Sequence, residues 1–381
     1  MPYTSAFQTR SEIVACKNLS PPNACAVALD IGYSAVKGYS ARNRFCFPSY
    51  VREHPAEIIG TPNAMDIFYR GENGVTYAVG SAALGSLSSR DTNDDTTTLF
   101  GRNRYFSPSF LILARVGIAL ALGKETTPEK PISLQTGLPP AYRKADTALL
   151  MEALSGSHAY AVKVGGGEWI NYAFNLQNIS VIDQPIGSVY SATKRADGTT
   201  VLCPDGRTYI DHNLLVLDGG FGTMDVFSIM NRSINSSNTF NDLGMKAIFE
   251  KTANDIFAAY GKEVHVHTLQ QYLASGTVNV LDRRSHTAAP RDFTDFLKKN
   301  TKKVFEQAIT KIEAAYDDLA DYEYLLVTGG TGAAWMDLLK ERYQGMSTLE
   351  IVTGNQNEKM PPVYNNVRGY YIFRALNLLK S

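Results

Sequence analysis

The chain has 381 residues, which is long enough for two domains and a large core. Lysine plus arginine and aspartate plus glutamate number 37 each, so the formal net charge is zero and nothing draws the chain generally to nucleic acid or an anionic membrane. The four cysteines have no zinc-type spacing and suit a reducing compartment. No secretory signal is visible at the start, so we expect a cytoplasmic protein with no membrane partner and no direct nucleic-acid binding.

The first part of the chain alternates strand and helix patterns. Residues 1–23 are polar, and we expect them to form an N-terminal extension ahead of the fold. Apolar runs on either side of Gly32 predict a hairpin, and Phe45–Tyr50 predicts an edge strand because Pro48 cannot donate to a ladder. The next expected elements are a hairpin entering a helix at 69–84, an exposed loop at 87–98, a buried helix at 110–123, a strand at 131–136, a helix at 142–154, a hairpin at 160–174, and a strand at 179–183 leading to a helix near Ser188.

The second part continues the alternation after a surface excursion at 199–209. His265 and His267 alternate as on one face of a strand, but no third metal ligand is near in the sequence. The lysines at 298–303 have acidic neighbours, which is typical of a solvated helix face. The other expected elements are a hairpin at 214–230, helices at 245–260 and 292–318, a strand at 322–327, a helix at 333–341, and a loop entering a terminal helix at 363–375. The alternation predicts a mixed sheet covered by helices, built twice.

The central hairpin carries the clearest chemical signal. An apolar strand pattern reaches Asp218, breaks over Gly219, Gly220, Phe221, Gly222 and Thr223, and then resumes. A turn so rich in glycine can bring backbone N–H groups close to an anion, and a carboxylate at a strand end offers oxygen to hydrated Mg²⁺. The pattern predicts a strand, a phosphate-binding turn and a second strand. The sequence contains no P-loop motif, in which a helix would follow the turn.

The same pattern occurs once before, with 188 residues separating the two acidic positions. Aligning the two stretches pairs Asp30 with Asp218 and Gly32 with Gly220. Either stretch alone is compatible with an ordinary glycine hairpin. Two hairpins of one design, about a domain apart, predict two similar lobes that hold one polyphosphate from opposite sides.

Three further features are candidates for this site. Lys37 lies on the strand leaving the first turn, where its ammonium could reach the β- and γ-phosphates, although a solvated strand lysine gives the same pattern. The glycine turn at 329–332 stands between a strand and a helix and could face a nucleoside, but its dinucleotide fingerprint is incomplete. Gln184 precedes Pro185 at a strand end, where it could orient an attacking water or lie in a surface turn.

Together these motifs resemble the actin superfamily, and most closely its bacterial plasmid-segregation branch, the ParM (StbA-like) actins. ALDIGYSAVKGYS resembles the first phosphate motif, LLVLDGGFGTMDVF the second, and LLVTGGTGAAWMDLL the adenosine motif. VIDQPIGSVYSA is similar to the start of the first interdomain connecting helix, and VYNNVRGYYIFRA to the second connector with its Asn-x-Arg-Gly-aromatic signature. FPSYVREH and YAVGSAAL also fit the N-terminal domain of that branch. The resemblance covers nearly the whole chain in the expected order.

The resemblance implies an α/β, actin-like (ribonuclease H-like) fold with two related lobes and a nucleotide cleft between them. Each lobe would have a mixed five-stranded sheet flanked by helices. Domain I would comprise residues 24–184 and 356–381, and domain II residues 185–355, after the extension at 1–23.

By position, the resemblance also implies a site for ATP, or GTP, with Mg²⁺. Asp30 and Asp218 would act as metal-site and catalytic residues through Mg²⁺-bound or attacking water. Gln184 stands where ParM-type proteins often have Glu and actin has Gln, which leaves its water-positioning role open. The phosphates would be held on one side by Gly32, Tyr33, Ser34 and Lys37 and on the other by Gly219, Gly220, Phe221, Gly222 and Thr223, and the nucleoside would be lined by Gly244, Gly329, Gly330, Thr331 and Gly332.

The function implied is a filament-forming ATPase that polymerises with itself and drives plasmid DNA segregation. Hydrolysis would destabilise the filament, and a DNA-binding adaptor would link filament ends to a centromere-like plasmid site. Two alternatives stay open. One is a small-molecule (sugar-type) kinase of the same superfamily, although the sequence shows no persuasive additional catalytic Asp. The other is a chromosomal or phage actin-like cytoskeletal protein without a role in plasmid partition. A chaperone-type ATPase is disfavoured, because little chain follows the second connector.

Overall fold

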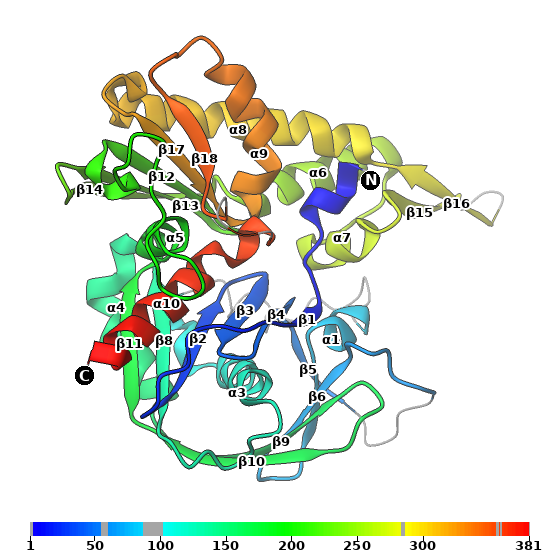
Figure 1. Ribbon diagram of the computed structural model, residues 1–381. Coiled ribbons are helices and arrows are strands. Elements are labelled where there is room, and N and C mark those ends of the chain that lie inside the picture. Colours follow the sequence, from blue (N-terminus) through cyan, green and yellow to red (C-terminus); the bar gives the residue numbers. More distant parts are fainter. Residues whose placement is uncertain are drawn as a thin grey trace.

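The computed structural model describes residues 3–54, 60–86, 102–282, 286–355, 358 and 360–380. Two lobes are visible in Figure 1. Lobe I, at the bottom, contains β1–β11, α1, α3 and α4, and lobe II, at the top, contains β12–β18 and α6–α9. Helices α5 and α10 lie where the lobes meet. The loop expected at 87–98 lies outside the described residues.

The main sheet of lobe I has six strands in the order β1-β4-β3-β2-β8-β11. Strands β2, β3 and β4 pair antiparallel, whereas β8 runs parallel to both β2 and β11. The prediction of an edge strand at Phe45–Tyr50 is wrong, because β1 pairs with the open side of β4. The bounds are β1 (Glu12–Ala15), β2 (Cys25–Ile31), β3 (Ala35–Ser40), β4 (Asn43–Pro48), β8 (Ile132–Leu138) and β11 (Asn178–Asp183).

A second sheet in lobe I, in the order β10-β9-β6-β7-β5, contains the two hairpins predicted near residues 69–84 and 160–174. Its strands are β5 (Val51–Glu53), β6 (Ile67–Arg70), β7 (Thr76–Val79), β9 (Gly156–Val164) and β10 (Ile170–Leu176). The helices of this lobe are α1 (Ser81–Gly85), α3 (Pro108–Leu122) and α4 (Pro140–Leu154). Helix α3 is buried as its apolar sequence predicts, and no helix in the described part of the chain is long and apolar enough to cross a membrane.

The sheet of lobe II repeats five strands of the lobe I sheet. Its order is β14-β13-β12-β17-β18, with β12, β13 and β14 antiparallel and β17 parallel to both β12 and β18. The series β4-β3-β2-β8-β11 has the same order and the same strand directions, so the predicted internal repeat is confirmed. The bounds are β12 (Leu214–Gly219), β13 (Thr223–Met230), β14 (Ser233–Asn241), β17 (Tyr324–Thr328) and β18 (Glu350–Thr353), and a separate ribbon pairs β15 (Thr277–Asp282) with β16 (Thr287–Asp292).

Helices cover both faces of each main sheet. In lobe II, α6 (Met245–Tyr260), α7 (Val266–Tyr272), α8 (Thr294–Ala315) and α9 (Gly329–Arg342) contribute to the core on one face, and α5 (Gln184–Thr193) covers the other. In lobe I, α3 packs on one face and α10 (Asn365–Lys380) on the other. The strand expected around His265 and His267 is wrong, because α7 begins at Val266, where His265 and Thr268 form a capping box.

The helices α5 and α10 cross at two glycines. A Cβ atom at Gly369 would overlap the carbonyl oxygen of Gly187, and a Cβ at Gly187 would lie 2.6 Å from the carbonyl oxygen of Asn366. Only residues without a side chain allow the two backbones to approach so closely. Each helix therefore packs on its own lobe and on the other helix, which links the two sheets through a rigid crossing.

Candidate functional site

A cavity of about 640 Å³ lies between the two lobes, and most of the predicted site residues line it. Those from the first hairpin are Asp30, Gly32, Tyr33, Ser34 and Lys37, and those from the second are Asp218, Gly220, Phe221, Gly222 and Thr223. Gln184, Gly329, Gly330 and Thr331 line the same cavity. Gly219, Gly244 and Gly332 are not in its wall. The structure therefore brings residues from distant parts of the sequence to one place.

The two glycine turns have the same closing bond. The Gly32 N–H donates to the Ala35 carbonyl at 3.0 Å, and the Gly220 N–H donates to the Thr223 carbonyl at 2.9 Å. The turns also meet across the cleft, since a Cβ at Gly222 would lie only 3.0 Å from the Tyr33 ring. Two matched hairpins of different lobes thus face the same space.

Several glycines, most of them outside the cavity wall, pack the turns against one another. A Cβ at Gly219 would overlap the backbone of Gly332, and Gly329 has a φ of +79° and would collide with Gly219 if it carried a side chain. A Cβ at Gly244 would lie 2.5 Å from the carbonyl oxygen of Phe221. These three glycines let the turn at 329–332 and the start of α6 approach the second phosphate turn closely.

Asp30 and Lys37 form an ion pair within the first hairpin. They are register partners across β2 and β3, and Lys37 Nζ lies 2.9 Å from Asp30 Oδ2. Burial is the largest influence and acts to lower the pKa of Lys37, but the Asp30 carboxylate together with smaller contributions from Cys46 and Asp218 outweighs it, so the net shift of the Lys37 pKa is upward. The lysine is therefore held as a cation inside the cleft.

Asp218 is buried at the end of β12 and accepts a hydrogen bond from Asn366 Nδ2 at 2.6 Å. Burial raises its pKa to about 6, helped by the charge of Asp30 and opposed by the Asn366 bond and by Lys37. Its register partner on β13 is Asp225, a third buried carboxyl in the cavity wall that the sequence analysis did not single out. Burial and the charge of Asp218 raise the pKa of Asp225 to about 7.

These shifts predict how stability depends on pH. The folded state holds protons on Asp218 and Asp225 up to about pH 6 and 7, whereas the unfolded chain releases them near the ordinary aspartate pKa of 3.8. The two protonated carboxyls therefore make their full contribution to the free energy of unfolding below about pH 4, and this contribution is lost as the pH rises to about 7. Asp218 alone accounts for a loss of about 3 kcal/mol. Urea denaturation of the nucleotide-free protein should give a lower free energy of unfolding at pH 8 than at pH 5. Asp225→Asn should flatten this slope, and a wild-type slope of the opposite sign would contradict the assignment.

Two further residues belong to the site. Asn366 on α10 connects Asp218 to Ser188 on α5, whose hydroxyl donates to Asn366 Oδ1 at 2.6 Å and lies 2.7 Å from Thr328 Oγ1. The Asn-x-Arg-Gly signature was the available sequence signal for this residue. Arg104, from the segment before α3, is buried in the cavity wall with its guanidinium 4.7 Å from the Tyr33 ring centroid. No local sequence pattern marked Arg104, which lies in the short 3₁₀ helix η2 (Arg102–Phe106).

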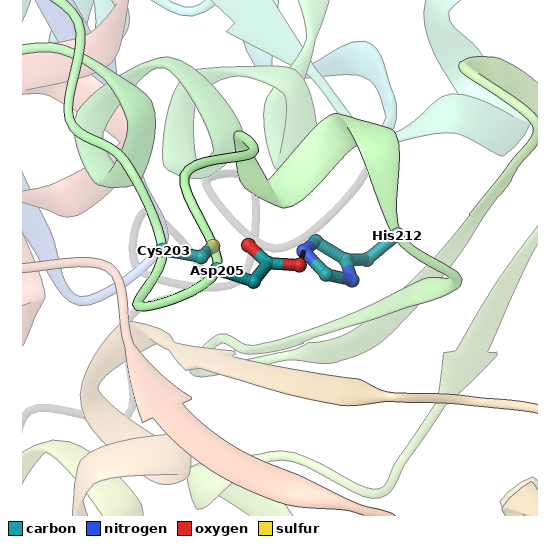
Figure 2. Close-up of side chains that lie close together, drawn as sticks. All are labelled: Cys203, Asp205 and His212. Carbon is teal, nitrogen blue, oxygen red and sulfur yellow. Dashed lines mark ion pairs between the residues drawn. The ribbon is translucent and has the colours of Figure 1, made fainter.

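A separate cluster of possible metal ligands lies on the excursion of lobe II, away from the cleft wall. Figure 2 shows that Cys203, Asp205 and His212 lie close together, and their ligand atoms are within 4.8 Å of one another. His212 Nε2 lies 3.4 Å from Asp205 Oδ2, and its Nδ1 lies 3.0 Å from Glu323 Oε1. Arg207 Nε already donates to the same Asp205 oxygen at 2.6 Å. Because this guanidinium supplies the positive charge, the cluster is explained as an ion-pair network that holds the excursion on β17.

Comparisons with known proteins agree with this geometry. Residues 28–187 match the family model described as actin like proteins N terminal domain. A comparison with curated protein sequences gives no match. Among solved structures, a non-polymerisable quadruple mutant of pCBH ParM is 18% identical, with 92% of this chain and 99% of that chain covered and a TM-score of 0.69.

Two other solved structures are informative. A 15-stranded ParM filament from Clostridium botulinum is 18% identical, with 93% of this chain and 99% of that chain covered and a TM-score of 0.68. Bacillus thuringiensis ParM with ATP is 15% identical, with 94% of this chain and 100% of that chain covered and a TM-score of 0.58. At these identities the likeness concerns the fold.

Proposed function

We propose that this chain, an actin-like protein with the fold of the bacterial ParM group, binds a nucleoside triphosphate with Mg²⁺ between its lobes and hydrolyses it. Hydrolysis would control the assembly of the protein with itself into a filament. The observation that carries the proposal is the convergence of two matched glycine turns, each with an acidic residue, on one interlobe cavity. Domain I would comprise residues 24–184 and 356–381, and domain II residues 185–355.

The donor set of the cavity fits a hydrated divalent cation. Asp30, Asp218 and Asp225 bring three carboxyl groups to the phosphate turns, where Lys37 pairs with Asp30, and Asp146 and Arg104 are buried in the same cavity wall. Burial, together with repulsion between the carboxylates, raises the pKa values of Asp218 and Asp225, so a divalent cation beside them would favour their ionised forms. Asp30 and Asp218 would hold Mg²⁺, through water molecules in the way this ion prefers. When bound, Mg²⁺ neutralises charge on the β- and γ-phosphates.

The backbone of the two turns would hold the phosphates. Residues 33–34 would present N–H groups from lobe I, and residues 221–222 would present them from lobe II, because the Gly32 and Gly220 N–H groups already close the two turns. Gln184, the first residue of α5, stands in the cavity wall, where its amide could orient the attacking water. Positioning and charge stabilisation are the main requirements of phosphoryl transfer, so a strong base is not needed.

A ligand that contacts both lobes can control assembly. It favours the closed arrangement by its differential affinity, and loss of the γ-phosphate weakens that preference. If closure shapes the surface that receives the next subunit, head-to-tail contacts produce an open filament whose stability follows the nucleotide. The structural neighbours include a filament, which supports this part of the proposal. By the same analogy, an adaptor bound to a plasmid site would couple the filament to DNA segregation.

Light scattering and electron microscopy of the purified protein test the proposal. Filaments should appear with ATP or GTP and Mg²⁺, and should disappear as phosphate is released. If no nucleotide causes assembly and the protein instead phosphorylates a sugar, the filament proposal is wrong and the kinase alternative is favoured.

Lys37→Ala tests the phosphate contact. We expect this variant to bind the triphosphate at least about tenfold more weakly, because removal of one charge-assisted contact costs about 1.5–3 kcal/mol. Adenosine affinity should change little, since the lysine lies beside the phosphate turn. Titration calorimetry with ATP and with adenosine measures both. Equal losses for the two ligands would contradict a role at the phosphates.

A further inference from the structure

The N-terminal segment belongs to both lobes. In Figure 1 the blue chain starts beside the helices of lobe II and descends to the sheet of lobe I. The 3₁₀ helix η1 (Tyr3–Phe7) packs against α8 and α9, whereas β1 pairs with β4. The residues expected to precede the fold thus span the two lobes. We call the segment Tyr3–Ala15 the strap.

The lobe II end of the strap is buried. Phe7 is 5% exposed and is part of the main core of lobe II, with its ring centroid 6.4 Å from that of Phe249. Thr4 is buried as well, and the Tyr3 ring lies 5.3 Å from the Phe7 ring and beneath Lys298 Nζ. Burial of a phenylalanine side chain contributes about 1.5–3 kcal/mol to stability, so this burial holds the start of the strap firmly on lobe II.

The lobe I end is held by a strand ladder. Residues Glu12–Ala15 pair antiparallel with β4, and the Cys16 N–H continues the pairing by donating to the Arg42 carbonyl at 2.9 Å. Tyr364 Oη donates to Glu12 Oε1 at 2.9 Å, which ties β1 to the segment that enters α10. This anchor involves several hydrogen bonds and is independent of the first.

Residues 8–11 connect the anchors and line the interlobe cavity. Four extended residues can hold Phe7 and Glu12 at most about 18 Å apart, so lobe separation at this side is limited while both anchors stay in place. A second contact bridges the same side, since Gln271 on α7 donates to the Leu84 carbonyl on α1. The strap therefore forms a wall of the cleft and restrains its opening.

The cavity wall near the strap differs from the phosphate turns. Phe7, Phe249 and Met245 give it apolar surface, and α7 contributes Gln270. Gln270 is 8% exposed, and neither its Oε1 nor its Nε2 has a hydrogen-bond partner among the described residues. A buried amide without partners costs about 1–3 kcal/mol, and Gln270 lines the cavity, so a ligand group that paired with this amide would remove that cost. A glutamine amide offers one donor and one acceptor, which match the exocyclic amine and adjacent ring nitrogen of adenine.

We propose that the strap closes the nucleobase end of the cleft over an adenine recognised by Gln270, so that the nucleotide leaves only when the strap releases one lobe. The inference rests on the proposed function, because it requires a nucleotide in the cleft. It adds two properties of this chain: slow nucleotide exchange, controlled by residues 3–15, and selection of ATP over GTP.

The first experiment slackens the strap without removing either anchor. Insertion of Gly-Ser-Gly-Ser between Thr9 and Arg10 should increase the dissociation rate of a fluorescent ATP analogue at least tenfold, measured by stopped flow with excess ATP. The matched control is the same insertion between Asp205 and Gly206, in the exposed turn of the excursion, which should leave the rate unchanged. Hydrogen exchange of the nucleotide-free variant should show β1 still protected.

The results of this experiment distinguish a failure of the proposed strap mechanism from a failure of the proposed nucleotide-binding function. If the wild type binds the analogue and the strap insertion releases it no faster than the control, the strap does not gate the cleft, although nucleotide binding stands. If the wild type binds no nucleotide at all, the proposed function is wrong and the inference falls with it.

The second experiment addresses base selection. The wild type should bind ATP at least tenfold more tightly than GTP, and Gln270→Leu should bring the ratio close to one. Gln270→Glu should shift the ratio toward GTP, because a carboxylate accepts from both donors on the Watson–Crick edge of guanine. Gln307→Leu, at an exposed position of α8, is the matched control. A preference that Gln270→Leu leaves unchanged would overturn the role of this residue.

Discussion

Asp218→Ala is expected to abolish ATP turnover, with a loss of at least about 100-fold in phosphate release, while the protein stays folded. The carboxylate lies at the point where the second glycine turn leaves β12 and is buried in the cleft wall. Removal of a single preorganised polar group from a reacting centre costs a factor of about 10²–10³ in other enzymes. Phosphate release at saturating ATP measures the effect.

The same substitution should not destabilise the nucleotide-free protein at pH 8. Since burial raises the pKa of Asp218 to about 6, its ionised form is held at a cost to folding, and alanine removes that cost. A normal or raised melting temperature together with lost turnover would identify a functional residue. Asp295→Ala, at an exposed position on α8, is the control. Unchanged turnover in Asp218→Ala would refute the catalytic assignment.

The sequence was sufficient for the features that depend on local pattern. The Asp and Gly spacing around Asp30 and Asp218 determines a strand end and a tight turn, so both hairpins and their pairing within the repeat could be predicted. The glycines at 219 and 329 also indicated close packing in the sequence, because only glycine fits where the two turns touch. Each of these signals lies within a dozen residues.

Features that depend on distant partners were not predictable in this way. The strap pairs with β4 about 30 residues downstream, and nothing in residues 12–15 specifies that edge. Asp225 sits in an apolar strand pattern, and its role appears only when β12 places it opposite Asp218. His265 and His267 gave a two-residue alternation, which is too short to distinguish a strand from a capped helix start.

The connectors show how a motif can be recognised before its physical role is known. The Asn-x-Arg-Gly signature was visible in the sequence, but its three polar or small residues act in different ways. Asn366 holds Asp218, Gly369 lets α10 cross α5, and Arg368 is fully buried between the two helices. The same short stretch of α10 therefore contacts the cleft residue Asp218 and forms the helix crossing that links the two lobes.

Arg368→Ala should have the largest effect on stability, with a loss of about 3–5 kcal/mol in the free energy of unfolding, as expected when one partner of a buried ion pair is removed. The guanidinium donates to Glu358 Oε1 at 2.6 Å, to the Ser191 carbonyl at 2.7 Å and to the Lys194 carbonyl at 3.0 Å. Truncation would leave two carbonyls at the C-terminal end of α5, and Glu358 in the segment before α10, without their donor. Chemical denaturation measures the loss, with Lys380→Ala at the exposed end of α10 as control.

Arg368→Lys distinguishes charge from geometry at the same position. An ammonium keeps the charge but cannot reach a carboxylate and two carbonyls in three directions at once, so we expect an intermediate loss of stability. Because these acceptors lie on α5 and the connecting segment while the arginine lies on α10, a weakened Arg368 should also loosen the crossing that relates the lobes. Arg368→Lys should therefore bind the triphosphate more weakly even at temperatures where it is fully folded. A stability loss below about 1 kcal/mol in Arg368→Ala would show that the crossing is held by the glycine contact and not by this network.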